Sequence, residues 1–275
     1  MPRAAGPESH RFDGAAAQWG TSVARAPAMR HLPLMLALLC ATAPAAAQED
    51  PPRWTFGLLA ADRDAPYTGL DEDLLVAPLV RFEGERLYVR GLRAGWRLVD
   101  TPSYELALIG QARFDGYDAE DSPFLVGMAD RRASLDLGIA STWTSKKLGA
   151  LELSAVADAL DRSGGGELAA SWNVLFRAGG WTIVPGATLR WQSEDLVDYY
   201  YGVRTSEGVV GRPPYAGEAA VTPDVSVLAT LPFAERWTFF VRASHAWLPS
   251  EITDSPIVDD DRSTGVFVGL GYSPD

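Results

Sequence analysis

Long segments in which apolar and polar residues alternate are the feature of this sequence that most constrains its fold. In the clearest of them, 104–114, one face carries Tyr104, Leu106, Leu108, Ala112 and Phe114, and the other carries Glu105, Gln111 and Arg113. Because side chains alternate across a strand, this period of two predicts one long strand with a single apolar face. Strands of soluble domains usually have about five or six residues, whereas a tilted strand that crosses a bilayer needs about nine to eleven. The length of the segment therefore favours an outer-membrane β-barrel.

Similar segments recur along the chain, and long and short connections separate them in turn. They predict strands at 53–61, 74–82, 86–99, 104–114, 132–143, 151–155, 167–177, 181–192, 221–231, 237–247 and 263–272. Outer-membrane barrels have short periplasmic turns, long external loops and an even number of strands. This alternation holds only if 86–99 contains two strands. We therefore predict an all-β, antiparallel up-and-down barrel of about 12 strands with both termini in the periplasm. A barrel of about ten strands is the alternative, because the 86–99 segment is short for two crossings.

A soluble antiparallel sandwich or barrel is the alternative fold, since its strands also alternate but turn their apolar face inward. Aromatic residues near the strand ends argue against it, because aromatic girdles mark the two membrane interfaces. These residues are Trp54, Trp143, Trp181, Trp191, Trp237, Trp247 and Tyr272.

The first 47 residues have the pattern of a secretory leader. A basic stretch, 29–31, precedes an apolar run, 32–40, and the small residues 45–47 suit a cleavage site. We expect translation to start at Met29 and cleavage to follow Ala47, so that 1–47 is an upstream extension plus signal peptide and 48–275 is the barrel. The only cysteine, Cys40, lies in this leader, so disulfides are not expected. A net charge of −12 without a basic stripe excludes nucleic acid as a partner.

Many charged residues fall on the inward face of the predicted strands. They are Glu105, Arg113, Arg132, Asp136, Glu152, Asp158, Glu167, Arg177, Arg190 and Arg242. They could line a selective pore, or they could pair with one another and fill a narrow barrel, because buried charges must be paired. We favour the paired network. Barrels of about eight strands are filled by side chains and those of about sixteen are open, so this one is intermediate.

Catalytic and metal-binding residues are not predicted. Hydrolases of this membrane need a nucleophile and a base, but residues 48–275 contain one histidine, His245, and the adjacent Ser244 points to the opposite face of its strand. A carboxylate-based site is the remaining catalytic alternative. The acidic loops 115–121 and 259–261 could bind Ca²⁺ or Mg²⁺, but the first lacks full EF-hand spacing and such loops are usually solvated. No cofactor is expected.

Four stretches, 91–98, 127–131, 197–203 and 251–259, resemble the MipA/OmpV family of outer-membrane proteins. The most specific marks are Asp198, Tyr199, Tyr200, Tyr201 and Gly202 in one stretch and Asp254, Ser255 and Pro256 in another. The resemblance covers 54–272 and implies a place in the outer membrane of a Gram-negative cell envelope, in contact with its lipid. One family member is a scaffold that links a lytic murein transglycosylase to a penicillin-binding protein; others are described as porin-like or adhesin-like. The resemblance thus implies a non-enzymatic scaffold, with a small channel or a surface interaction protein as the alternative. It implies no catalytic residues.

We expect Tyr199–Tyr201 to pack the long loop over the barrel mouth or to sit in the interfacial belt, with an exposed recognition patch as the alternative. We expect Asp254–Pro256 to form a turn in the last external loop.

Overall fold

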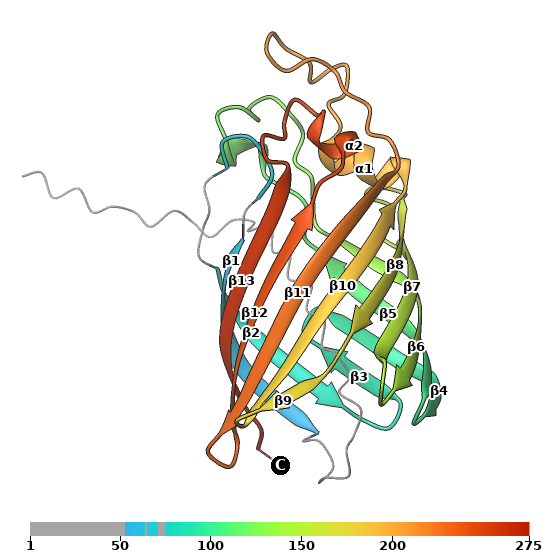
Figure 1. Ribbon diagram of the computed structural model, residues 1–275. Coiled ribbons are helices and arrows are strands. Elements are labelled where there is room, and N and C mark those ends of the chain that lie inside the picture. The colour runs from blue at the N-terminus through green and yellow to red at the C-terminus, as the bar shows by residue number, and fades with distance from the viewer. Residues whose placement is uncertain (1–52, 64, 71–74, 275) are drawn as a thin grey trace, which may run out of the picture. The chain divides into compact units, whose positions relative to one another are not determined.

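A computed structural model describes residues 53–63, 65–70 and 75–274 of the chain. The predicted leader and start codon lie outside these residues. Within them the chain forms a closed antiparallel β-barrel, because β10 pairs with β11 and completes the ring of strands (Figure 1).

The described residues form thirteen strand segments, which make the barrel wall, and three short helical segments, which lie in the long connections. The strands are β1 (Trp54–Arg63), β2 (Leu75–Glu83), β3 (Leu87–Arg90), β4 (Arg93–Thr101), β5 (Tyr104–Arg113), β6 (Ser134–Ser145), β7 (Gly149–Asp158), β8 (Gly166–Asn173), β9 (Phe176–Ala178), β10 (Trp181–Gln192), β11 (Ala220–Phe233), β12 (Trp237–Trp247) and β13 (Arg262–Tyr272). The helical segments are η1 (Ala119–Asp121), α1 (Glu194–Tyr201) and α2 (Ser250–Thr253).

β8 and β9 are two parts of one wall strand. Both pair with β10 in the same register, from Glu167 opposite Gln192 to Ala178 opposite Trp181. The ladder is interrupted where the Val174 N–H donates to the Pro185 carbonyl at 3.0 Å, because proline has no N–H to return the bond. Counted this way, the described barrel has twelve strands, which confirms the prediction.

The ambiguous segment 86–99 contains two strands, as the alternation of loops required. β3 and β4 are joined by a tight turn at Gly91 and Leu92, and Gly91 adopts a φ of 61°, which glycine tolerates without strain. β3 has only four residues, so the short segment suffices for both strands.

Apolar side chains cover the outside of the barrel. On β5, Leu108 is 48% exposed, whereas Ala107 and Ile109 on the opposite face are buried. Leu58, Leu137 and Leu168 are also more than half exposed on the outer face. An apolar surface of this extent on the outside contradicts the soluble alternative and fits a lipid-facing band. No helix in the described ranges is long and apolar enough to cross a membrane.

The two ends of the barrel differ. Short turns and the C-terminal end of β13 lie at one end, and the long connections, with α1 and α2, lie at the other (Figure 1). Aromatic pairs gather near the short-turn end, among them Trp237 with Tyr272 (ring centroids 5.1 Å apart) and Tyr104 with Trp143 (5.5 Å). Because outer-membrane barrels keep short turns in the periplasm, the short-turn end is the periplasmic rim and the loops are external.

Candidate functional site: a loop cap above a charged lumen

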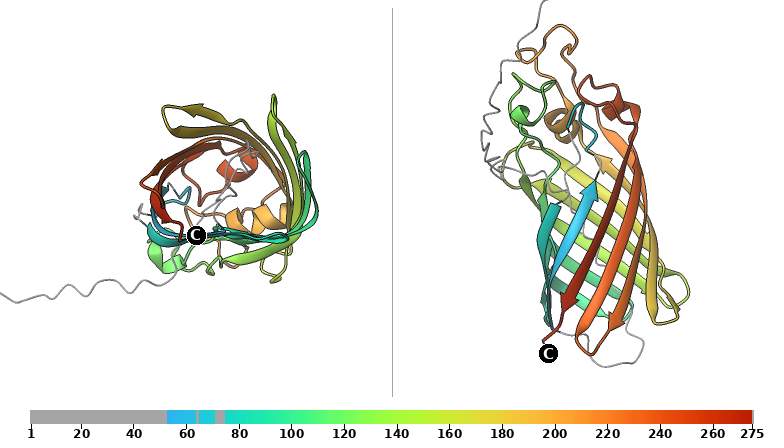
Figure 2. Two further views of the ribbon diagram at one scale, coloured as in Figure 1. Left: turned by 90° about the horizontal axis from the view of Figure 1, so that it is seen from below. Right: turned by 90° about the vertical axis from the view of Figure 1, so that its left-hand side faces the viewer.

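The external loops share one apolar core, which we call the loop cap and define as the described residues of 65–70, 115–131, 193–219 and 248–261. Its fully buried side chains include Leu125, Val197 and Ile257, each from a different loop. Viewed from the periplasmic end, α1 and α2 project inside the ring of strands (Figure 2). The loops therefore fold over the barrel mouth and do not extend freely into solvent.

Tyrosines form the centre of the loop cap. The Tyr67 hydroxyl donates to the Asp115 carbonyl at 2.7 Å, and its ring lies 4.7 Å from that of Tyr117 and 5.7 Å from that of Tyr201. Burial raises the pKa of Tyr67 well above its usual value and that of Tyr117 to about 12. These phenols therefore stay neutral and act as hydrogen-bond donors in a water-poor core.

One buried ion pair joins two loops of the cap. Arg131, only 2% exposed, donates from Nη1 and Nη2 to the two carboxylate oxygens of Glu207 at 3.1 and 2.8 Å. Glu207 also accepts the backbone N–H groups of Ala129 and Arg204 at 3.0 Å each. Burial opposes ionisation, but these hydrogen bonds outweigh it and lower the pKa of Glu207 to about 2. The pair is a bidentate clamp between the second and third long loops.

The two most specific family-like motifs meet in the loop cap. The Ser255 hydroxyl, from the Asp254–Pro256 stretch, donates to the carbonyl of Tyr201 at 2.5 Å. Asp198 accepts the Gly217 N–H at 2.9 Å and so fixes the return of the long loop. Tyr200 and Tyr201 are buried in the cap, while the Tyr199 hydroxyl accepts the Arg132 N–H at 3.0 Å. These motif residues hold the loops to one another.

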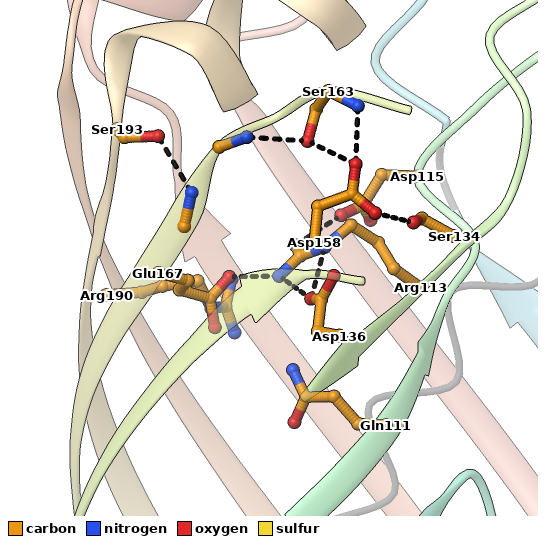
Figure 3. Close-up of polar contacts among 12 residues, drawn as sticks. Gln111, Arg113, Asp115, Ser134, Asp136, Asp158, Ser163, Glu167, Arg190 and Ser193 are labelled. Carbon is orange, nitrogen blue, oxygen red and sulfur yellow. Dashed lines mark hydrogen bonds and ion pairs between the residues drawn. The ribbon is translucent and has the colours of Figure 1, made fainter. Parts of the chain in front are cut away.

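A compact ion cluster lies directly beneath the cap (Figure 3). Arg113 donates from Nε to Asp136 at 2.8 Å, from Nη1 to Asp115 at 2.9 Å and from Nη2 to Glu167 at 3.1 Å. Arg190 adds a second cation 3.5 Å from Glu167. Four of these five side chains are buried, so their charges are compensated mainly by one another and not by bulk water.

A second ion cluster lies on the lumen side of β2 to β5 and reaches β7. Glu83 receives Arg90 at 2.7 Å, Arg97 at 2.8 Å and Arg81 at 3.2 Å, and Arg97 also donates to Glu105 at 2.7 Å. Arg93 pairs with Glu152 at 2.7 Å.

A buried tyrosine on β3 organises this second cluster. The Arg90 guanidinium lies 4.1 Å and that of Arg97 4.8 Å from the Tyr88 ring centroid. The ring fits because its neighbour on β4 is Gly95, where a Cβ atom would overlap it. Both arginines therefore form cation–π contacts with one tyrosine ring in addition to their ion pairs with carboxylates.

The inward charges predicted from the sequence do not all join these clusters. Glu105, Arg113, Asp136, Glu152, Glu167 and Arg190 lie in ion pairs. Arg242 is buried and donates to the Ser226 hydroxyl at 3.2 Å. Asp158 instead closes the 159–165 turn, where its carboxylate accepts the Ser134 hydroxyl and the Gly164 N–H, the latter at 3.1 Å.

Arg132 and Arg177 are exposed and lie outside both clusters, so neither joins the paired network that the sequence favoured. Arg132 precedes the first residue of β6, so strand alternation does not fix its direction, and its neighbour Arg131 turns inward instead. Arg177 keeps the inward parity of β8 and β9, opposite to exposed Phe176, and lies near the end of the strand at the periplasmic rim.

Sequence reasoning missed Glu83, Arg90, Arg93, Arg97 and the Arg131–Glu207 clamp. Alternation of Arg93 and Arg97 with outward Trp96 and Leu98 was a usable signal for part of this set. The clamp had no such signal, because 76 residues separate its partners.

His245 has a structural environment on the outer face of β12. Its Nδ1 lies 2.9 Å from the Thr264 hydroxyl and its ring packs edge-on against Trp247 at 4.7 Å. Among the residues the structure describes, no group of three or more histidine, cysteine, aspartate or glutamate side chains could hold a metal ion.

Comparison with known proteins places this barrel in context. The family model described as "MltA-interacting protein MipA" matches residues 56–274. A relative named YiaT, from Escherichia coli K12, is 31% identical over 224 residues, 79% of this chain and 89% of that protein. The MltA-interacting protein of the same strain is 27% identical over 242 residues, 87% of this chain and 97% of that protein. Outer membrane protein OmpV of Vibrio cholerae is 27% identical over 156 residues, 57% of this chain and 60% of that protein.

Proposed function

The chain belongs to the MltA-interacting protein family of outer-membrane barrels, and we propose that it is a non-enzymatic scaffold for peptidoglycan-processing enzymes at the periplasmic face. We further propose that residues 1–47 are removed on export, so that intact mass spectrometry of the membrane protein should give a chain beginning at Gln48.

The folded loop cap over the external mouth is the observation that carries this proposal. The loop cap has its own apolar core and a buried Arg131–Glu207 clamp, and the lumen beneath it contains paired charges. Such an arrangement favours a barrel that acts through its rims over one that passes solutes. Contact with the outer-membrane lipid then serves as the anchor.

A lytic murein transglycosylase is the partner that we propose first. Its support is the name of the relative that is 27% identical over nearly its whole length, which says that this relative interacts with MltA. We propose a penicillin-binding protein as a second partner.

Capture from periplasmic extract tests the scaffold. Purified full-length protein in nanodiscs should retain a lytic transglycosylase, whereas an unrelated outer-membrane barrel in the same nanodiscs should not. Equal retention by both barrels, or by neither, would contradict the proposal.

Absence of catalysis is part of the same proposal and has its own test. His245 and the Thr264 hydroxyl that it contacts both lie on the lipid-facing surface of the barrel, where the water that a hydrolase consumes is excluded. We expect His245→Ala to leave any hydrolysis of murein or lipid by the preparation unchanged; loss of such activity would refute the assignment.

An external interaction role is the alternative that one feature favours. The tip of the longest loop exposes Val209 (58%) and Val210 (106%), and Arg212 anchors it through hydrogen bonds to the carbonyls of Glu207 at 3.0 Å and Val126 at 3.3 Å. Binding of whole cells to an immobilised surface ligand, lost in Val209→Ser/Val210→Ser, would support that role over the scaffold.

A further inference from the structure

One wall strand extends past its neighbour at the periplasmic rim. β8 and β9 keep one register with β10 down to Ala178 opposite Trp181, but β7 pairs with β8 only as far as Ala150 opposite Asn173. Below that point β9 pairs with β10 alone, at the bottom of the barrel (Figure 1). Residues 176–178 therefore form a free sheet edge, which we call the β9 edge.

The main chain of Arg177 points to the open side of this edge. Gly179 and Gly180, with φ of 56° and 86°, form a two-residue hairpin turn whose closing pair, Ala178 and Trp181, exchanges both ladder bonds. Bonding alternates along an antiparallel pair, and the Val174-to-Pro185 bond at 3.0 Å fits this alternation. The N–H and C=O of Arg177 then face away from β10, where no described strand pairs with them.

Basic side chains lie on the β9 edge and on the neighbouring β6–β7 turn. The β6–β7 turn carries Lys146 and Lys147, both exposed, and it lies against β8 because the Trp172 indole donates to the Leu148 carbonyl at 2.7 Å. Arg177 on the edge itself is exposed too. None of these three cations forms an ion pair with a described residue.

The same features place the edge in water. Free main-chain groups and unpaired cations are very costly in hydrocarbon, so the β9 edge lies at or below the headgroup level on the periplasmic side. Leu148, 71% exposed, and Phe176, 55% exposed, add apolar contacts beside the cations. A soluble periplasmic protein can therefore reach the edge.

We propose that the β9 edge, with Lys146, Lys147 and Arg177, binds an extended acidic segment of a periplasmic protein, which joins the sheet as an added strand. Main-chain hydrogen bonds select an extended chain and the three cations select an acidic one. This proposal rests on the proposed scaffold function and supplies its docking surface. Strand addition needs only a few residues, which suits a rim whose turns are short. Anionic lipid headgroups would use the cations but not the Arg177 N–H.

Two pairs of variants separate the main-chain contact from the charges. Arg177→Gln removes only the charge, whereas Arg177→Pro also removes the N–H, which β10 does not use. Lys146→Glu/Arg177→Glu reverses two charges at the edge. Arg86→Glu/Arg236→Glu makes the same change in net charge at the β2–β3 and β11–β12 turns of the same rim.

Binding of a fluorescent peptide of alternating glutamate and valine is measured by anisotropy, with the full-length protein in phosphatidylcholine nanodiscs. We expect Arg177→Gln to weaken binding about threefold, and Arg177→Pro and the edge double variant to weaken it about tenfold or more. The control double variant should bind like the wild type. Capture of lytic transglycosylase by the same proteins should follow the same order.

Each other outcome contradicts a specific statement. No binding to the wild type, or equal binding by all variants, overturns the β9 edge as a peptide site. Altered affinity only for phosphatidylglycerol nanodiscs assigns the cations to lipid and overturns it as well. Capture of transglycosylase that the edge variants leave intact removes the edge but keeps the scaffold, whereas peptide binding at the edge without any capture refutes the scaffold instead.

Discussion

Removal of the Glu207 carboxylate should open the loop cap while the barrel stays intact. In Glu207→Ala, Arg131 keeps the carbonyls of Ala129 (2.8 Å) and Gly202 (3.2 Å) as hydrogen-bond acceptors but no carboxylate, and its Nε already lacks a hydrogen bond in the described structure. A buried cation that loses its carboxylate costs about 3–5 kcal/mol. The cost applies to the cap, because both residues lie in loops and not in the strand ladder.

Hydrogen exchange read by mass spectrometry in nanodiscs measures this opening. At about 1.4 kcal/mol for each factor of ten, amides of 115–131 and 203–215 should exchange roughly 10²- to 4 × 10³-fold faster. Amides of β10 and β11 should keep their wild-type rates. The matched control is Glu251→Ala, another external carboxylate, whose side chain accepts a hydrogen bond from the Ser250 hydroxyl at 3.3 Å and forms no ion pair with a described residue.

The refuting result is cap exchange in Glu207→Ala within about threefold of the wild type. A double variant, Arg131→Met/Glu207→Leu, should restore most of the protection, since replacing both members of a buried pair by apolar residues is often neutral. Failure of that rescue would mean that the clamp acts through more than charge.

Three further predictions concern the ion clusters and the cap. Arg113→Met leaves Asp115, Asp136 and Glu167 buried with too few cations, so urea unfolding in lipid vesicles should show a free energy of unfolding lower by about 3–5 kcal/mol. Arg190→Met removes a longer ion pair and should lower it by less than about 1 kcal/mol. Gly95→Val places its side chain on the Tyr88 ring and should destabilise the barrel by about 1–3 kcal/mol, seen as a lower midpoint temperature for the heat-induced shift in gel mobility. Gly110→Ala is the control, because its Cβ would lie 3.1 Å from a Leu137 methyl group and should be tolerated. Since the pKa of Glu207 is lowered to about 2 from 4.5, its contribution is complete above pH 4.5 and is lost as the pH falls toward 2, so limited proteolysis of the cap should accelerate only in that range and not between pH 5 and 7.

The wall of the barrel could be predicted from the sequence because its information is local. Alternation fixes which face of β5 turns outward, and strand length separates a membrane strand from a soluble one. The existence of two strands in 86–99 followed from loop alternation alone. The four-residue length of β3 could not be predicted, because it depends on where the chain turns. Gly91 permits the turn by adopting a positive φ, but the sequence does not require the turn to be there.

The loop cap could not be predicted in the same way because its contacts are not local. Arg131 and Glu207 lie in different loops, and Ser255 reaches the carbonyl of Tyr201 across 54 positions. Near strand ends a shift of one residue changes which side chain turns inward, which is why Arg131 is buried and Arg132 is exposed. The family-like motifs indicated which loops to examine. That their residues hold the loops to one another could be learned only from the structure.

Conductance of the purified full-length protein in planar lipid bilayers is the measurement that tests the closed barrel most directly. With the loop cap folded over a lumen of paired charges, the wild type should give no stepwise current, and Glu207→Ala should give brief openings. Steady, ion-selective steps from the wild type would contradict closure, and with it the argument that this protein acts through its rims.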